Sequence, residues 1–219
     1  MQEKRRKIIL STRQDLTPNE FIERAEREGI ELEKGAVITN EYLERHYEDL
    51  CKWVNLFTAY PDYYLDIIKP ADSEFSLFFY QRFTLRALMR FKDVFITAPR
   101  AFSKSFITIL ALFLQCVFIP GRKVFMTANT KQQAAQITKE KIYEIYDHWP
   151  LLKKEIIGWE LSDYPGNFGK DYVTLKFRNG SVFDVVLAGD AARGGRRHGG
   201  FIDEIRDSDE EAINSVVIP

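Results

Sequence analysis

Cysteine is scarce in this chain of 219 residues, where Cys51 and Cys116 are the only two and lie far apart. Neither belongs to a CxxC pair or to a cysteine and histidine spacing, which argues against zinc and a disulfide framework and suits a reducing cytosol. The net charge is also low, because 31 basic residues nearly balance 32 acidic ones and leave a formal charge of −1. No global basic field attracts nucleic acid, so any DNA contact must come from a local patch or an assembled ring.

Long apolar runs are missing as well. The longest, residues 106–119, is shorter than a membrane span and contains Gln115. The N-terminal sequence MQEKRRK has no apolar segment of the signal-peptide kind behind it. We therefore expect a soluble intracellular protein without a membrane partner. Its 45% hydrophobic and 14% aromatic content is ample for the packed core of one domain plus an appendage.

The second half of the chain has the pattern of alternating strands and helices. We predict strands at 94–97, 122–129, 173–177, 181–187 and 201–202, and helices at 79–91, 104–118 and 130–149. This order indicates an α/β fold with a mainly parallel sheet flanked by helices. Asn179-Gly180 predicts a tight hairpin between two of the strands, which we interpret as an antiparallel insertion.

The first part of the chain has helical patterns of its own. Helices are predicted at 17–28 and 41–58, and the second carries one apolar stripe that needs a partner. We interpret residues 1–70 as a helical N-terminal extension or lid and residues 71–219 as the core domain.

Residues 94–106, VFITAPRAFSKSF, have the layout of a phosphate-binding P-loop, G-x-x-x-x-G-K-[ST], between a strand and a helix. In this interpretation Lys104 reaches the β- and γ-phosphates and the Ser105 hydroxyl ligates Mg²⁺. Both glycines of the pattern are replaced, by Ala98 and Ser103. The chemistry survives provided that the loop needs no positive φ, because Ala and Ser carry the same phosphate-binding N–H groups. A surface turn with a solvated lysine is the alternative.

Residues 189–207, GDAARGGRRHGGFIDEIRD, bring a glycine- and arginine-rich loop into a short apolar strand that ends in Asp203-Glu204. Open α/β sheets bind ligands at this end of their strands. A P-loop ATPase needs such a pair, with Asp203 holding Mg²⁺ through its water shell and Glu204 polarising the attacking water. The alternative is that both carboxylates cap the next helix. The ATPase hypothesis requires that Lys104-Ser105 and Asp203-Glu204 lie side by side.

Gln81 lies just upstream of the predicted P-loop strand. Its carboxamide combines a donor and an acceptor, as the edge of adenine requires. An ordinary exposed helix glutamine is the alternative.

Taken in order, the segments FFYQRF, APRAFSKS, VFMTANTKQQA, FRNGSVF, ARGGRR and FIDE resemble the ATPase domain of the terminase large subunit of tailed bacteriophages, the motor that packages DNA into procapsids. The resemblance covers residues 53–207 and rests on the order and spacing of loose motifs. It implies a RecA-like P-loop (ASCE) fold that binds and hydrolyses ATP with Mg²⁺.

The resemblance also implies roles for individual residues. Metal binding falls to Ser105 and Asp203, and catalysis to Lys104, Arg100, Arg193 and Glu204. The implied nucleotide-binding residues are Gln81, Pro99, Arg100, Ala101, Phe102, Ser103, Lys104, Ser105 and Phe106. Arg193 resembles the arginine finger that enters the neighbouring subunit's site and stabilises charge on the transferring phosphate. Arg196 and Arg197 are alternatives for this role, and either could instead contact DNA phosphates.

As partners, the resemblance implies double-stranded DNA, a portal protein, a small terminase subunit and further copies of the chain in a homo-oligomeric ring in the host cytoplasm. The coupling motif and the nuclease domain of this family have no counterpart before Pro219, so we expect a fragment that hydrolyses ATP slowly without an arginine supplied in trans. A helicase-like DNA translocase and a P-loop-derived scaffold protein without hydrolysis are the alternative functions.

Overall fold

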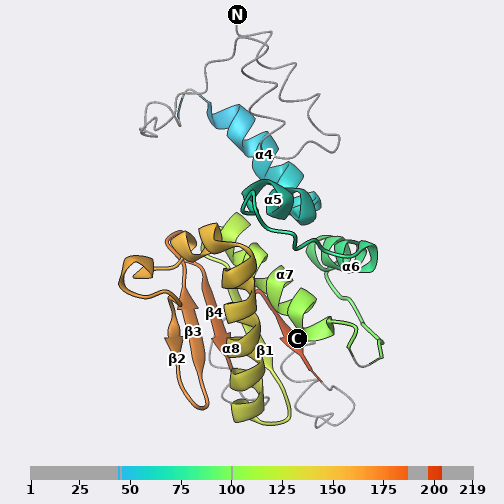
Figure 1. Ribbon diagram of the computed structural model, residues 1–219, viewed down its shortest axis with the longest axis vertical. Coiled ribbons are helices and arrows are strands. Elements are labelled where there is room, and N and C mark those ends of the chain that lie inside the picture. Colours follow the sequence, from blue (N-terminus) through green and yellow to red (C-terminus); the bar gives the residue numbers. More distant parts are fainter. Residues whose placement is uncertain (1–43, 45, 100, 187–196, 204–219) are drawn as a thin grey trace, which may run out of the picture.

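A computed structural model describes residues 44, 46–99, 101–186 and 197–203 of the chain (Figure 1). The predicted helix at 17–28 lies outside the described residues, and so do Arg100, Arg193, Arg196 and Glu204. None of the helices in the described part is both long and apolar enough to cross a lipid bilayer.

A mixed sheet of five strands forms the centre of the described chain, in the order β2-β3-β4-β1-β5. Its strands are β1 (Lys123–Thr127), β2 (Asn167–Phe168), β3 (Val173–Lys176), β4 (Val182–Val185) and β5 (Gly199–Ile202). Strand β1 pairs in parallel with β4 and with β5, whereas β3 is antiparallel to β2 and β4. The α/β class is therefore confirmed, and the predicted hairpin supplies both an antiparallel pair and a parallel member of the sheet.

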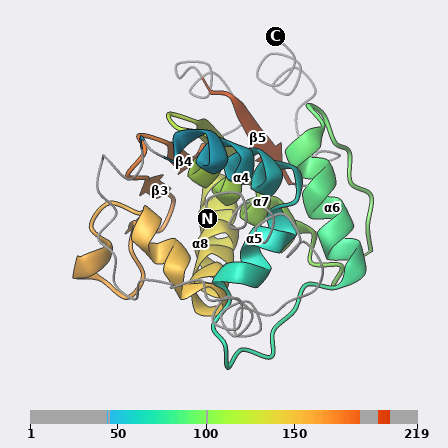
Figure 2. The same cartoon turned by 90° about the horizontal axis from the view of Figure 1, so that it is seen from above.

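Helices cover the sheet in layers (Figures 1 and 2). They are α4 (Tyr47–Ala59), α5 (Pro61–Ile68), α6 (Phe79–Arg90), α7 (Lys104–Phe118) and α8 (Lys131–His148), followed by the 3₁₀ helices η1 (Pro150–Glu155) and η2 (Trp159–Leu161). Both α7 and α8 lie against the same face of the sheet, and α4, α5 and α6 lie beyond α7. Helix α7 has the predicted bounds, and its nearly continuous apolar sequence is explained by burial on most sides.

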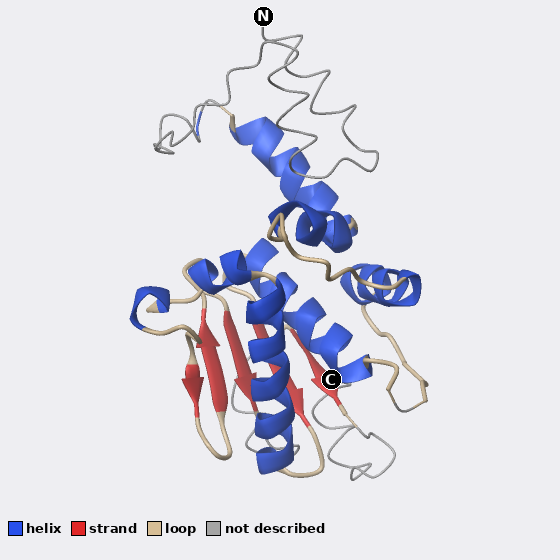
Figure 3. Cartoon of the chain, in the orientation of Figure 1, coloured by secondary structure: helices blue, strands red, loops and turns tan. Residues whose placement is uncertain are grey.

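The predicted strand at 94–97 is wrong. These residues lie in the loop that Figure 3 draws between α6 and α7, and no described strand pairs with them. Their sequence is typical of a strand, but a strand is stable only with a ladder partner and a buried face. Phe95 is 79% exposed, so burial does not favour a strand here either.

The hairpin between β3 and β4 also holds the end of α7. Gly180 has a φ of +83°, as a tight turn after Asn179 requires. The Asn179 side-chain amide donates to the carbonyls of Cys116 (2.8 Å) and Val117 (3.1 Å) and so satisfies the end of the helix. Cys116 itself is buried, and burial raises the pKa of its thiol to about 12.

An ionic cluster joins α5 to α6. The fully buried Asp62 accepts hydrogen bonds from Arg86 Nε (2.8 Å) and Nη2 (2.6 Å), and Arg82 Nη1 lies 3.4 Å from it. Arg82 also donates to Asp66 through Nη2 at 2.9 Å. The hydrogen bonds to Asp62 raise the pKa of the Arg86 guanidinium. We call Asp62, Asp66, Arg82 and Arg86 the α5–α6 ion cluster, and it fixes the start of α6 relative to α5.

Candidate active site

Three of the predicted site residues meet in space. Lys104 Nζ lies 3.3 Å from Asp203 Oδ1, and the Ser105 hydroxyl donates a hydrogen bond of 3.1 Å to Asp203 Oδ2. Ser105 and Asp203 are separated by 98 positions in the chain. The expected convergence of the Lys-Ser step with the acidic strand end is therefore found for Lys104, Ser105 and Asp203.

The fold brings these residues together at the carboxyl end of the parallel strands. Lys104 and Ser105 open α7, whereas Asp203 directly follows β5. The Asp203 N–H donates to the Thr127 carbonyl at 3.0 Å and so continues the pairing of β1 with β5. Asp203 is 6% exposed, which places a carboxylate in a partly desolvated position beside an ammonium group.

Two glycines help to build β5, although glycine is disfavoured within strands. Gly199 and Gly200 open this strand, and a Cβ at Gly200 would clash with the ring of Phe125 on the neighbouring strand. Their sequence predicts a loop at these positions, and the strand prediction at 201–202 begins two residues too late. Gly200 instead allows the close approach that carries the chain to Asp203.

The loop before Lys104 contains two residues in the left-handed region. Ala101 has a φ of +65° and Ser103 a φ of +57°. The condition that the loop needs no positive φ is therefore not met, and Ser103 violates it at the place of the second P-loop glycine. A left-handed conformation costs a non-glycine residue roughly 1–2 kcal/mol. The loop thus has backbone conformations that glycine adopts most easily, although an alanine and a serine occupy these positions.

Gln81 is 5% exposed, so the alternative of an ordinary exposed glutamine is wrong. Its Oε1 accepts a hydrogen bond of 2.8 Å from the Phe78 N–H and caps the first turn of α6. The carboxamide oxygen thus has a structural use. Contact with adenine stays a prediction.

An aromatic contact links α6 to the loop before Lys104. The Tyr80 ring lies 4.4 Å from the Phe102 ring, measured between centroids. The sequence analysis interpreted the aromatic residues of this part of the chain as packing and did not single out this pair. Tyr64 and Phe75 do pack, against Phe118 and Phe106 of α7.

Arg197 makes an ion pair within the chain. Its Nη2 lies 2.7 Å from Asp184 Oδ2 on β4, and the guanidinium lies 6.0 Å from the centre of the Phe125 ring. Arg197 side-chain exposure is only 18%. The residue therefore holds the start of β5 to the sheet, and its alternative role as an arginine finger stays a prediction.

The side chains at this contact that could hold a metal ion carry oxygen atoms. The described residues contain no group of three or more His, Cys, Asp or Glu side chains arranged for a metal ion. Ser105 and Asp203 instead offer a hydroxyl and a carboxylate, the hard ligands that Mg²⁺ accepts together with phosphate oxygens and water. The two side chains by themselves do not make a dedicated metal centre within the described residues.

Thr127 is a residue that the sequence analysis missed. Its hydroxyl is buried without a hydrogen-bond partner within the described residues. Thr127 pairs with Ile202 in register, so strand alternation places its side chain on the face opposite to that of Asp203. The sequence signal was a polar residue at the end of an apolar strand.

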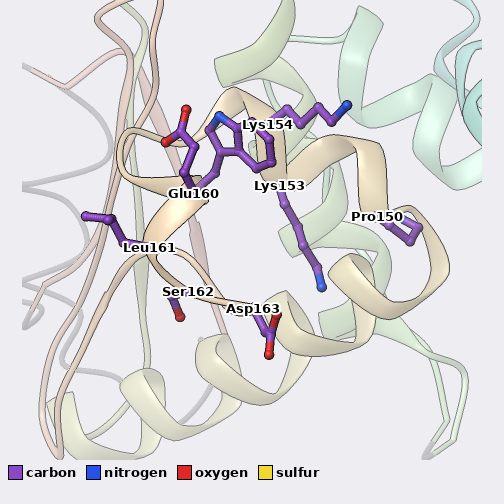
Figure 4. Close-up of a pocket in the computed structure, with 8 residues that line it drawn as sticks. Pro150, Lys153, Lys154, Glu160, Leu161, Ser162 and Asp163 are labelled. Atoms are coloured by element: carbon purple, nitrogen blue, oxygen red, sulfur yellow. The ribbon is translucent and has the colours of Figure 1, made fainter.

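A hollow of about 440 Å³ lies away from this site, beside η1 and η2 (Figure 4). Because α8 follows the carboxyl end of β1 and runs back along the sheet, η1 lies at the opposite end of the strands from Asp203. The hollow is lined by Pro150, Lys153, Lys154, Trp159, Glu160, Leu161, Ser162 and Asp163. Its mixed charges and its position separate it from the Lys104 and Asp203 contact.

Neither the models of known protein families nor the curated proteins match this chain. The functional assignment therefore depends on the geometry above and on the order of the motifs.

Proposed function

We propose that the chain is a Mg²⁺-dependent ATP hydrolase of the RecA-like P-loop class. The order of its motifs further favours the ATPase domain of a viral DNA-packaging terminase large subunit. Such a domain acts on double-stranded DNA in a homo-oligomeric ring, together with a portal protein and a small terminase subunit. The observation that carries the proposal is the meeting of Lys104 and Ser105 with Asp203.

The chemistry of the side chains is what supports magnesium. Ser105 and Asp203 lie in contact and offer a hydroxyl and a carboxylate, which would hold Mg²⁺ directly or through its bound water. Bound Mg²⁺ would neutralise charge on the phosphate oxygens.

Lys104 has a role in both states of the proposed site. Without nucleotide its ammonium group partly neutralises Asp203, with 32% of the lysine side chain exposed. In the proposed complex the ammonium turns to the β- and γ-phosphates, which carry more negative charge. Glu204 is the residue that we propose to orient and polarise the attacking water.

The sheet gives partial support to a RecA-like arrangement. The parallel order β4-β1-β5 places Asp203 at the carboxyl end of β5, where such enzymes carry their acidic residue. The strand expected before Lys104 is not part of the described sheet.

The test measures Mg·ATP binding by calorimetry and turnover by phosphate release. We expect Lys104→Ala to weaken binding and abolish turnover, and Glu204→Gln to bind ATP but hydrolyse it at least about 100-fold more slowly. Lys52→Ala is the matched control, because Lys52 forms an exposed ion pair on α4. Double-stranded DNA and a purified portal protein are then added to look for stimulation.

The left-handed conformations at Ala101 and Ser103 favour one other function. The missing P-loop glycines suggest a P-loop-derived scaffold or binding protein without hydrolysis. Absence of ATP binding in the parent chain would favour this alternative. Hydrolysis that DNA and portal protein leave unchanged would contradict the terminase assignment but not the ATPase.

A further inference from the structure

Helix α6 presents a row of phenylalanine rings to solvent. Phe79, Phe83 and Phe91 follow one another at spacings of four and eight residues, so they lie along one side of the helix. Their side chains are 84%, 68% and 66% exposed. Three such rings offer roughly 400 Å² of apolar surface, a size of patch that marks an interaction site on many soluble proteins.

The end of this row carries a positive charge without an acidic partner. Helix α6 contains three arginines and no acidic residue. Arg82 and Arg86 belong to the α5–α6 ion cluster. Arg90 instead donates to the Ala59 carbonyl at 3.1 Å and has no carboxylate partner within the described residues. We call the exposed residues of this side the α6 face: Phe79, Phe83, Arg90 and Phe91.

A second exposed apolar surface surrounds the hollow beside η1 and η2. Leu161 lines the hollow and is 89% exposed, and the nearby Ile157 is 60% exposed (Figure 4). Pro150 and Trp159 also line it. A hollow of about 440 Å³ is large enough to admit an aromatic side chain of another molecule.

The free charges of this second surface are negative. Residues 158–164 contain Glu160 and Asp163 but no basic residue. Neither carboxylate has an ion-pair partner within the part of the chain that the structure describes. The two lysines of the hollow lie over aromatic rings of the same surface. We call the exposed residues here the η2 face: Ile157, Glu160, Leu161 and Asp163. Its carboxylates complement the free guanidinium of the α6 face.

The two faces lie on opposite sides of the molecule. In both views of the ribbon, α6 lies on one side and the short helices that follow α8 lie on the other (Figures 1 and 2). The α6 face therefore cannot reach the η2 face of its own chain. Two different complementary surfaces can meet only between copies, and such a head-to-tail contact repeats into a ring or a filament.

We propose that the α6 face of one copy of the chain docks on the η2 face of the next copy. A phenylalanine of the row enters the hollow, and Arg90 lies beside Glu160 or Asp163. This inference goes beyond the proposed function, because the association needs no nucleotide. It assigns two surfaces to the contact between copies, neither of which contains a residue of the nucleotide site.

The experiment measures self-association of the full chain by sedimentation velocity without nucleotide, from about 1 to 100 μM. The average mass of the parent chain should rise with concentration. Phe83→Ser and Leu161→Asp should each weaken association at least about 10-fold, because each removes an apolar side chain from one face. Tyr47→Ser is the matched control, since it removes a 67% exposed ring from α4, outside both faces, and should associate as the parent does.

A mixture of the two variants tests the head-to-tail arrangement. Phe83→Ser keeps an intact η2 face, and Leu161→Asp keeps an intact α6 face. Each variant alone should stay monomeric, whereas the mixture should form a one-to-one dimer and nothing larger. Undiminished self-association of Leu161→Asp would show that α6 faces pair with each other, which overturns the inference.

Three further outcomes are decisive. A parent chain that stays monomeric overturns the inference. In urea unfolding, a larger loss of stability in Phe83→Ser than in Tyr47→Ser would show that the chain itself covers the Phe83 ring, which overturns it as well. Head-to-tail association of a chain that binds no ATP would support this inference and overturn the proposed function.

Discussion

Two buried carboxylates of this molecule have cationic neighbours but differ in kind. Asp62 is fully buried and receives hydrogen bonds from the forked guanidinium of Arg86, with Arg82 close by. Asp203 meets the ammonium of Lys104 and the hydroxyl of Ser105 at the end of a strand. Guanidinium groups bind carboxylates in a fixed planar geometry, whereas an ammonium on a flexible stem and a hydroxyl are easily turned to another partner.

The comparison indicates which acidic residue stabilises the fold and which is available for chemistry. A carboxylate held by two arginines is committed to joining α5 and α6. A carboxylate held by a lysine and a serine at the edge of the sheet can exchange those partners for a metal ion and phosphate. The variants below test this difference, in order of decreasing expected effect.

The largest effect is expected from removing Arg86. Arg86→Met leaves Asp62 buried with Arg82 as its remaining partner, so the free energy of unfolding should fall by about 3 kcal/mol. Lys104→Met removes a partly exposed ion pair, and the expected loss is under about 1 kcal/mol. Urea unfolding of both variants measures the difference. Equal losses would show that the two clusters do not differ as we infer.

Ligand binding should act on one cluster only. At a Mg·ATP concentration of 100 times the Kd, the parent chain should gain about 2.7 kcal/mol in its free energy of unfolding. Asp203→Asn should lose most of this gain, because the amide replaces one metal-binding oxygen and removes the charge. Arg86→Met should retain the gain on its lower baseline. A gain that survives in Asp203→Asn would separate Asp203 from the ligand site.

The loop before Lys104 provides a test of backbone strain. Ser103→Gly relieves a positive φ and should raise the free energy of unfolding by about 1 kcal/mol. Ala98→Gly is the matched control at the first glycine position, where φ is not positive, and should lower it by roughly 0.5–1 kcal/mol. Thermal and urea unfolding measure both variants. A loss of stability in Ser103→Gly would contradict the strained conformation.

The smallest effect concerns His148, a half-buried imidazole that lies against aromatic rings. Burial against the rings of Phe75 and Phe106 lowers the pKa of His148 below its ordinary 6.5, although Glu144 and Asp147 oppose the shift. The unfolded chain therefore binds the proton more readily. The contribution to stability is complete above pH 6.5 and falls as the pH decreases below it.

Urea unfolding of the parent chain and of His148→Phe between pH 7 and pH 5 checks this sign. The variant should lose less stability than the parent as the pH falls. A steeper loss of stability in the variant would show that protonation of His148 stabilises the folded chain, contrary to the expected direction.

Local sequence patterns predicted the elements whose stability is local. The apolar segment after Ser103 predicted α7, and Asn179-Gly180 predicted the hairpin. Both features depend on residue order and hydrophobic period, which the chain displays directly. The contact of Lys104 with Asp203 is not local; the ATPase hypothesis required it, and the structure shows it.

Features that depend on distant partners were not predictable. The prediction of a strand at 94–97 was wrong, because no local sequence signal shows whether a neighbouring strand is present to pair with it. The burial of Asp62 depends on Arg82 and Arg86, which lie 20 and 24 residues away. The left-handed φ of Ser103 could not be predicted, because a serine, unlike a glycine, is not a signal for a positive φ.

The burial of Cys116 has a practical consequence for experiments on this chain. A thiol with a pKa of about 12 stays protonated near neutral pH and reacts little with alkylating reagents. The only other cysteine is Cys51, which is partly exposed on α4. A maleimide dye should therefore attach at Cys51, and its fluorescence would report on the surroundings of α4.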